Sequence, residues 1–402
     1  MPLPVLGNLL DLGGNLHHTL ARLARAHGRV MKLKLGLVTT VVVSSRDAAR
    51  EAYTRYDRQL AARAVPDAAN AVGNSGRSMI WLPSSDPLWK TLRGIVASPP
   101  RAACASARCA TWWATSAATR GRRWTSAMPW LASLGGARYQ KVFGILDGII
   151  DRRLADGRTS TGEHARGDFL DSLLELVSAG KIGRDKVTVI LFDVFAAGTD
   201  TMAITVEWAI AELLRHPHAM AKVRAEMADI LGGKDTDALE EPDAASLPYL
   251  QAVVKEVMRL HPVAPIMLPH QAAEDGVEIG GCAVPRGATV IFNAWAIMRD
   301  PAAWERPDEF VPERFVLDKA ADRAVEFRGK DYEFIPLGSG RRLCPGLPMA
   351  ERVVLFVLAS LLHAFEWRLL HGVLADELDV AEKFTTVNTL AVPLRAVPVV
   401  VT

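Results

Sequence analysis

One long helical pattern constrains the fold of this chain more than any other feature. It runs from about Arg184 to His216, and Pro217 follows it directly. At 1.5 Å per residue such a helix spans roughly 50 Å, enough to cross a whole domain. Shorter helical patterns surround it, at residues 15–27, 47–56, 141–154, 169–177, 217–231, 246–260 and 345–365, and one more opens at Asp86-Pro87. Short β-branched runs at 30–35 and 39–44 predict strands, so we expect a mainly α chain with small β-sheets.

Composition excludes several classes of protein. The 402 residues carry a formal net charge of +2, which argues against a strongly basic nucleic-acid binder. The four cysteines are too few for a disulfide framework and favour a reducing compartment. The sequence contains no uninterrupted run of 18 apolar residues, so no membrane span is predicted. Its first residues lack the pattern of a signal peptide.

The segment between Asp86 and Asp147 is compositionally abnormal. Its 60 residues contain no Asp or Glu, where about seven are expected from the overall composition. Within it, residues 98–130 contain four of the ten Trp and two of the four Cys and show no helical or strand period. A basic nucleic-acid patch and a disordered loop are two alternatives. We favour a third, a shifted reading frame or gene-model error over residues 98–130 within an otherwise single domain, 1–402.

A glycine-rich loop ends in a cysteine just before the last predicted helix. The loop, residues 334–346, reads FIPLGSGRRLCPG, with the cysteine at position 344. A sulfur there faces backbone N–H groups and the positive end of a helix dipole, and both favour the thiolate. The glycines allow the backbone to wrap around the sulfur and to approach a flat ligand closely. Cys344 is therefore a candidate metal ligand, with an ordinary buried free cysteine as the alternative.

Two further segments become informative beside this loop. The long helical pattern contains AAGTDT at residues 196–201, where a Thr hydroxyl can bond back to the carbonyl four residues earlier. Taken alone, it is an ordinary helix with a glycine for close packing. Glu256 and Arg259 form an i,i+3 pair, a common arrangement worth only tenths of a kcal/mol on a helix surface.

Together these segments resemble the cytochrome P-450 superfamily. The loop is similar to its haem-binding pattern F-x-x-G-x-R-x-C-x-G. Gly340, Arg342, Cys344 and Gly346 match, and Leu337 stands in the Phe position. The resemblance implies that Cys344 is the axial ligand of the iron of heme b and that Arg342 pairs with a haem propionate.

The resemblance assigns roles to the other segments as well. It implies that Thr201 hydrogen-bonds the oxygen substrate and that Asp200 relays protons from solvent. It also implies a structural charge cluster that holds the haem loop. Its members are Glu256, Arg259 and Arg314, the last in a P-E-R-F motif at residues 312–315.

Three more positions match the family's contacts to the haem propionates. Trp89 and Arg93 fit W-x-x-x-R, which places an indole and a guanidinium at a propionate. His270 lies where the family often supplies another donor, with a surface histidine as the alternative reading.

The implied activity is that of a plant microsomal monooxygenase. One oxygen atom of O2 would enter a small hydrophobic substrate, with electrons from NADPH through a separate NADPH-cytochrome reductase. The phrase FNAWAI at residues 292–297 is similar to plant members, and the terpenoid hydroxylases resemble the chain best. The implied location is the cytosolic face of the endoplasmic reticulum membrane, and no nucleic acid is expected as a partner.

The same resemblance predicts an incomplete fold. Microsomal relatives begin with an apolar anchor helix and a Pro-rich hinge, and this chain is expected to start inside that hinge. Only 103 residues separate Arg93 from Ala197, several dozen fewer than in relatives, so part of the helical roof over the substrate pocket is expected to be missing. Two alternatives therefore stay open. One is a non-catalytic or unstable gene product with poor haem retention. The other is a reductase-independent protein that rearranges peroxides, against which an intact Asp200-Thr201 argues.

Overall fold

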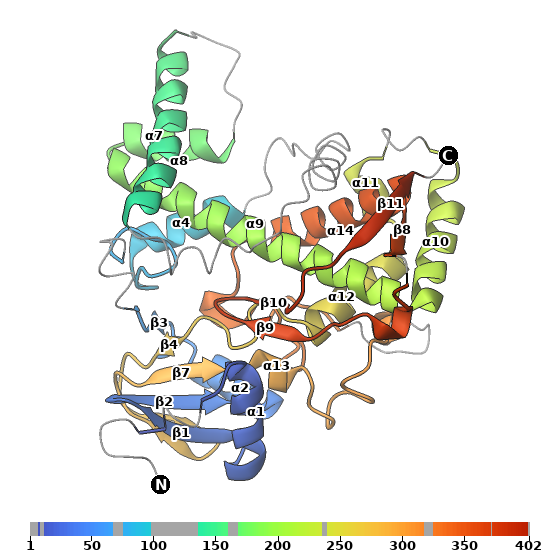
Figure 1. The fold of residues 1–402 in the computed structure, drawn as a ribbon. Helices are drawn as coiled ribbons and strands as arrows, with labels where there is room; N and C mark the ends of the chain where they lie inside the picture. Colours follow the sequence, from blue (N-terminus) through green and yellow to red (C-terminus); the bar gives the residue numbers. More distant parts are fainter. Residues whose placement is uncertain are drawn as a thin grey trace.

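The computed structural model describes residues 7–8, 12–66, 75–97, 136–159, 168–234, 239–316, 325–370 and 372–400. Its longest element is helix α9, which runs through the middle of the molecule (Figure 1). The helices are α1 (Leu16–His27), α2 (Arg46–Arg55), α4 (Pro87–Ala97), α7 (Gly136–Thr159), α8 (Phe169–Ser178), α9 (Arg184–Arg215), α10 (Pro217–Leu231), α11 (Glu241–Ala245), α12 (Pro248–Leu260), α13 (Ala294–Ile297) and α14 (Leu347–Ala364). The strands are β1 (Val30–Leu35), β2 (Val38–Val43), β3 (Ala62–Arg63), β4 (His270–Gln271), β5 (Val277–Ile279), β6 (Cys282–Val284), β7 (Thr289–Phe292), β8 (Phe365–Leu369), β9 (Glu382–Phe384), β10 (Asn388–Leu390) and β11 (Ala396–Val400).

Helix α9 organises the packing along its whole length. Its first half contacts α7 and α8, and its second half contacts α10, α12 and α14. Pro217 ends the helix because it cannot continue the hydrogen-bond ladder, and it instead takes the first position of α10. The core around the second half includes the fully buried Trp208, which stacks on His261 at 3.8 Å between ring centroids. This core fixes the surroundings of the cysteine loop, because α14 begins directly after that loop.

The largest sheet lies beside this helical part and has the strand order β1-β2-β7-β4-β3. The predicted strands at 30–35 and 39–44 form the antiparallel β1–β2 pair, with Val30 opposite Val43. Strand β7 joins β2 in parallel, and β4 connects β7 to β3. The pairing of β3 with β4 places His270 opposite Arg63. Pattern reading does not predict this contact, because β3 and β4 have only two residues each and lie far apart in sequence.

The prediction of a mainly helical chain with small β-sheets is confirmed. The abnormal segment, residues 98–130, lies outside the described residues, so its origin and the single-domain organisation stay predictions. Two described helices, α9 and α14, are long and apolar enough to cross a membrane by length and composition alone, although neither is an unbroken apolar run. Their most apolar windows are 39% and 56% buried, and the two helices contact each other.

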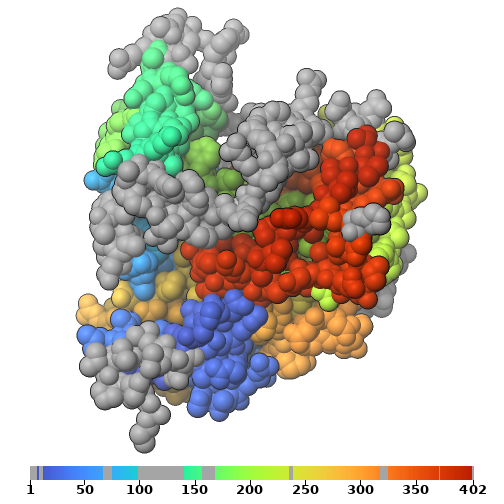
Figure 2. Space-filling view, in the orientation of Figure 1, coloured from blue at the N-terminus to red at the C-terminus, as the bar shows by residue number. Residues whose placement is uncertain are grey.

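Two segments far apart in the sequence, the start of α1 and strand β9, meet on one face of the molecule. Figure 2 shows the C-terminal segment, in red, in contact with the N-terminal elements, in blue. Asn15, just before α1, donates a side-chain hydrogen bond to the carbonyl of Glu382 at 2.9 Å and accepts one from Phe384 N at 2.9 Å. These bonds join the start of α1 to strand β9.

Candidate functional site

The cysteine loop is a tight turn tied at both ends. Cys344 N donates to the carbonyl of Leu337 at 3.0 Å, which closes the loop on itself. Gly340 has φ +63°, and a Cβ there would lie 2.2 Å from Oδ1 of Asp57, so only glycine fits. The same Asp57 carboxylate accepts a hydrogen bond from Arg341 N at 2.8 Å. Gly346 immediately precedes α14, so the sulfur sits at the start of that helix, as the sequence predicts.

Opposing effects act on the pKa of the Cys344 thiol. The backbone N–H of Gly346 and the charge of Arg93 lower its pKa, in line with the predicted stabilisation of a thiolate. Burial acts more strongly, however, and raises the pKa of Cys344 above its ordinary value. The backbone N–H therefore acts in the predicted direction, but burial outweighs it. A coordinated metal ion would be needed to hold the sulfur in the deprotonated form. The side chain is a free thiol and only half-buried, so part of its surface is open to a ligand.

Trp89 and Arg93 on α4 lie beside this loop, as the sequence predicts. Arg93 donates from Nη2 to the carbonyl of Leu343 at 2.6 Å. Its guanidinium carbon lies 4.9 Å from the centroid of the buried Trp89 ring, and that of Arg342 lies 4.8 Å from the same ring. Arg342 donates to the carbonyls of Ala61 and Leu82, each at 2.7 Å.

His270 also joins this group, and it is buried rather than on the surface. Its Nδ1 lies 2.7 Å from the carbonyl of Leu60. Burial, helped by the charges of Arg63 and Arg342, lowers the pKa of His270 to about 3, so the ring is neutral at physiological pH. The competing reading of a surface histidine is therefore wrong.

Sequence reasoning misses one member of this cluster, Arg63. Burial, opposed by Tyr53 and assisted by Arg93, lowers the pKa of Arg63 to about 10. Its Nε atom is buried without a hydrogen-bond partner. Arg63 belongs to no motif quoted above, and only its pairing opposite His270 brings it to the site.

The resulting cluster has an unbalanced charge. Burial, Arg63 and Arg93 together lower the pKa of Arg342 to about 9. In the described part of the chain, no carboxylate lies within ion-pair distance of Arg63, Arg93 or Arg342. Buried charges are normally paired, because taking an unpaired charge out of water is costly. Two carboxylates beside a half-buried thiol would complete this site, and haem carries two propionates.

Helix α9 brings its AAGTDT segment next to the helix that follows the cysteine loop. A Cβ on Gly198 would lie 3.2 Å from Cε of Met349 in the first turn of α14. The glycine therefore permits close approach of the two helices, which the sequence reading left as one alternative. Thr201 donates from Oγ1 to the carbonyl of Ala197 at 2.5 Å, the predicted back-bond. Asp200 is half-buried beside it.

The predicted charge cluster behind the loop is present. Glu256 and Arg259 are fully buried and joined by two hydrogen bonds of 2.7 and 2.9 Å. Arg314 donates from Nε to Glu256 at 3.2 Å. Arg259 also lies 5.3 Å from the centroid of the Trp304 ring, whose Nε1 donates to the carbonyl of Glu333 at 3.3 Å. The cluster therefore supports the chain directly before the cysteine loop.

A second missed group lies on α9, just under one turn before the AAGTDT segment. The buried Asp193 accepts hydrogen bonds from Ser78 Oγ at 3.0 Å and Met79 N at 2.8 Å. Burial raises its pKa to about 6. It ties α9 to the segment that leads into α4, the helix of Trp89 and Arg93.

The described residues also line a cavity of about 720 Å³, which lies elsewhere. Glu212, His216, His261 and Arg299 are among its lining residues. None of the predicted site residues lines it, and we assign the chemistry to the cysteine loop on geometry instead.

Comparisons with known proteins agree with this geometry. The family profile described as Cytochrome P450 matches residues 1–117 and 115–388. The chain is 56% identical to Cytochrome P450 76M5 of Oryza sativa subsp. japonica, over all of this chain and 91% of the relative. From the same organism, Oryzalexin E synthase is 54% identical over 99% of this chain and 90% of its own length. Ent-cassadiene C11-alpha-hydroxylase 1 is 51% identical, over 100% of this chain and 92% of its own length.

Solved structures show the same fold. A zebra fish cytochrome P450 with abiraterone superposes with a TM-score of 0.75 and 25% identity, over 95% of this chain and 99% of that one. The alignment to Cytochrome P450 76M5 runs over 466 positions, 64 more than the 402 residues here. The relative therefore has additional residues within the aligned region. The chain belongs to the cytochrome P450 family and is a haem-dependent monooxygenase.

Proposed function

We propose that heme b binds with its iron on Cys344 and its propionates on Arg63, Arg93 and Arg342. The observation that carries this proposal is the cluster of three arginines without a carboxylate, beside a half-buried thiol. Propionates would neutralise charges that the protein alone leaves unpaired. The single N–H of the neutral His270 ring donates to the Leu60 carbonyl, so His270 would donate to a propionate only in its protonated form.

The haem, when bound, supplies the iron centre at which O2 is activated. The protein's own residues then orient groups and move protons. The Thr201 hydroxyl now donates to the Ala197 carbonyl, and rotation about its side-chain torsion would present the same proton to a ligand in the groove. Asp200 would resupply that proton from solvent, since a carboxylate one residue away exchanges protons readily with water.

The proposed reaction is hydroxylation of a small terpenoid hydrocarbon. Substrate and O2, with two electrons and two protons, would give the hydroxylated product and water. The electrons would come from NADPH through a membrane-bound reductase, on the cytosolic face of the endoplasmic reticulum. The relatives named as oryzalexin synthases and an ent-cassadiene hydroxylase support a terpenoid substrate.

One observation favours a second candidate function, a non-catalytic gene product. The alignment to Cytochrome P450 76M5 contains 64 positions more than this chain has residues. Two large apolar side chains, Phe195 on α9 and Ile145 on α7, are each 57% exposed. Missing roof helices would leave such a surface uncovered. The third alternative, a peroxide-rearranging enzyme, is disfavoured because Asp200 and Thr201 are both in place on α9.

Expression of two proteins distinguishes the first two candidates. One is this chain, and the other carries the middle segment of Cytochrome P450 76M5 in place of residues 98–135. Each is assayed with reductase, NADPH and ent-cassadiene for haem content and hydroxylated product. Product from both supports a working enzyme as given. Haem and product from the second alone supports the damaged-gene candidate. Retained haem without product from either would overturn the terpenoid assignment.

A further inference from the structure

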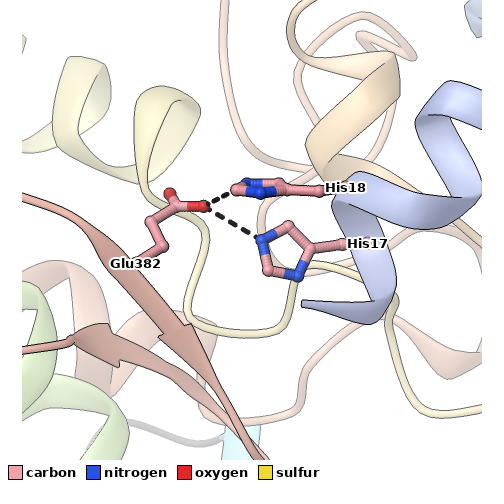
Figure 3. A group of neighbouring side chains, drawn as sticks. All are labelled: His17, His18 and Glu382. Atoms are coloured by element: carbon pink, nitrogen blue, oxygen red, sulfur yellow. Dashed lines mark hydrogen bonds and ion pairs between the residues drawn. The ribbon is translucent and has the colours of Figure 1, made fainter. Parts of the chain in front are cut away.

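A second group of ligand-type side chains lies far from the cysteine loop, where α1 meets strand β9. His17 and His18 are consecutive in the first turn of α1, and both Nε2 atoms contact the same oxygen of Glu382 (Figure 3). The distances from Oε2 are 2.9 Å to His17 and 2.8 Å to His18. Consecutive helix residues normally point about 100° apart, so this convergence is a specific arrangement.

Hydrogen bonds to the surrounding backbone hold the three side chains in place. Asn15 joins the start of α1 to the backbone on both sides of Lys383, by two bonds of 2.9 Å. Asn293 donates from Nδ2 to the carbonyl of His17 at 3.0 Å. The backbone that carries the two imidazoles is therefore fixed relative to the carboxylate, and a ligand would find the group already assembled.

The second carboxylate oxygen of Glu382 has its own partners. His261 Nδ1 lies 3.1 Å from Oε1, and His261 Nε2 lies 2.7 Å from Glu212. Such contacts orient a carboxylate and leave its other oxygen free to bind a cation. Arg299, 3.9 Å from the same Oε1, adds a positive charge that limits the affinity for any cation.

We propose that His17, His18 and Glu382 form a binding site for Zn²⁺. The three ligand atoms all lie within 4.8 Å of one another, and among the described residues this is the one such group. Tetrahedral Zn²⁺ with bonds of about 2.0–2.1 Å needs its ligand atoms roughly 3.3–3.5 Å apart. The two imidazoles therefore need to move away from the carboxylate by only about half an ångström. His18, with 41% of its side chain exposed, provides the entry side and the position for a water ligand.

The protonation states of these side chains are compatible with Zn²⁺ binding. Zn²⁺ binds neutral imidazole, and burial lowers the pKa of His17, which keeps that ring uncharged. Coordination at Nε2 requires the ring proton to move to Nδ1. Nδ1 of His17 is buried and makes no other hydrogen bond, so it can take this proton. The hydrogen bond from Nε2 to Glu382 is lost in this change, and the bond from Nε2 to Zn²⁺ replaces it. The carboxylate stays ionised, because its histidine partners hold the pKa of Glu382 far below its usual range.

Equilibrium dialysis of the full chain against Zn²⁺, without an affinity tag, tests the site. Zinc and iron are counted in the same sample by elemental analysis, so that haem is accounted for separately. We expect about one Zn²⁺ per chain and binding at least about tenfold weaker in His18→Gln. His27→Gln, an exposed histidine at the other end of α1, is the matched control and should bind like the wild type. Equal binding by wild type and His18→Gln, or no binding by the wild type, would overturn the proposal.

A spectroscopic measurement on the wild type keeps the test decisive if the variant does not fold. The extended X-ray absorption fine structure of the loaded protein, measured at the zinc edge, should show two imidazoles and oxygen ligands at about 2.0–2.2 Å. A sulfur ligand at about 2.3 Å would place the ion on a cysteine, such as Cys344 in haem-free chains, and would refute the histidine site.

Discussion

Arg63, which is half-buried, lies directly opposite the buried His270 in the antiparallel pairing of β3 and β4, and neither side chain has an acidic partner among the described residues. The charge of Arg63 contributes to lowering the pKa of His270 to about 3. Arg63 therefore extends the row of unpaired cations that starts at Arg93 and Arg342. A bound dianion would relieve the repulsion, which makes Arg63 a sensitive position for testing the haem proposal.

The variant Arg63→Met should separate haem binding from folding. Haem affinity should fall about 10- to 100-fold, the loss expected for one charged hydrogen bond to a propionate. The stability of the haem-free protein should not fall, because the substitution removes a cation that Arg93 repels and that has no acidic partner among the described residues. Haem transfer to apomyoglobin measures the first quantity and urea denaturation the second. Arg55→Met, on the exposed face of α2, should leave haem affinity unchanged and cost less than about 1 kcal/mol of stability. Unaltered haem affinity in Arg63→Met would exclude Arg63 from the propionate site.

The sulfur ligand is tested by spectroscopy of the reduced protein with carbon monoxide. Wild type should show the strongly red-shifted Soret band of a thiolate complex, and Cys344→Ser or Cys344→His should lose it. Cys282→Ser should keep the band, because Cys282 lies on strand β6 of a separate two-stranded sheet. Persistence of the band in Cys344→Ser would contradict the assignment.

The proton-delivery role of Thr201 predicts uncoupled turnover in Thr201→Ala. NADPH consumption should continue while product per NADPH falls by about tenfold. This is less than the roughly 10²- to 10⁴-fold that a positioned proton donor contributes, because water can replace the hydroxyl in part. The remaining electrons should appear as hydrogen peroxide. Thr205→Ser is the control, because Thr205 makes the same back-bond one turn later, to the Thr201 carbonyl at 2.8 Å. A product-to-NADPH ratio that stays at the wild-type value would remove Thr201 from proton delivery.

The buried pair of Glu256 and Arg259 predicts a large stability effect. Arg259→Leu leaves the Glu256 carboxylate buried with fewer partners, which should cost about 3–5 kcal/mol of unfolding free energy. Arg55→Met breaks an exposed i,i+4 pair with Glu51 and should cost less than about 1 kcal/mol. Urea denaturation at neutral pH measures both variants. If both variants lose less than about 1 kcal/mol of unfolding free energy, water must reach the Glu256 cluster.

Asp193 predicts a pH-dependent contribution to stability. Its pKa is raised from 3.8 to about 6 in the folded protein, so the folded state binds a proton more tightly than the unfolded chain. The contribution is therefore fully present below about pH 4 and is lost as pH rises through about 6, a change of about 3 kcal/mol. The difference in unfolding free energy between wild type and Asp193→Asn, measured from pH 4 to 8, isolates it from other carboxylates. A pH-independent difference would mean that Asp193 is not desolvated.

Local patterns in the sequence determined the helices and the reactive loop. The extent of α9, for example, follows from helical periodicity and from Pro217, and both act within a few residues of the chain. The cysteine loop could be found for the same reason, since its glycines, arginine and cysteine are contiguous. The buried Glu256–Arg259 pair was predictable only through resemblance, because its spacing alone is common.

The tertiary structure decided which distant side chains share an environment. Arg63 reaches the site through pairing with β4, whose His270 lies more than 200 residues away, and Glu382 meets His17 across 365 residues. The pKa of Cys344 shows the same limit: its helix-start position was readable, but the burial that outweighs it was not. Burial and charge pairing depend on atoms brought together from the whole chain, and only the folded structure contains that information.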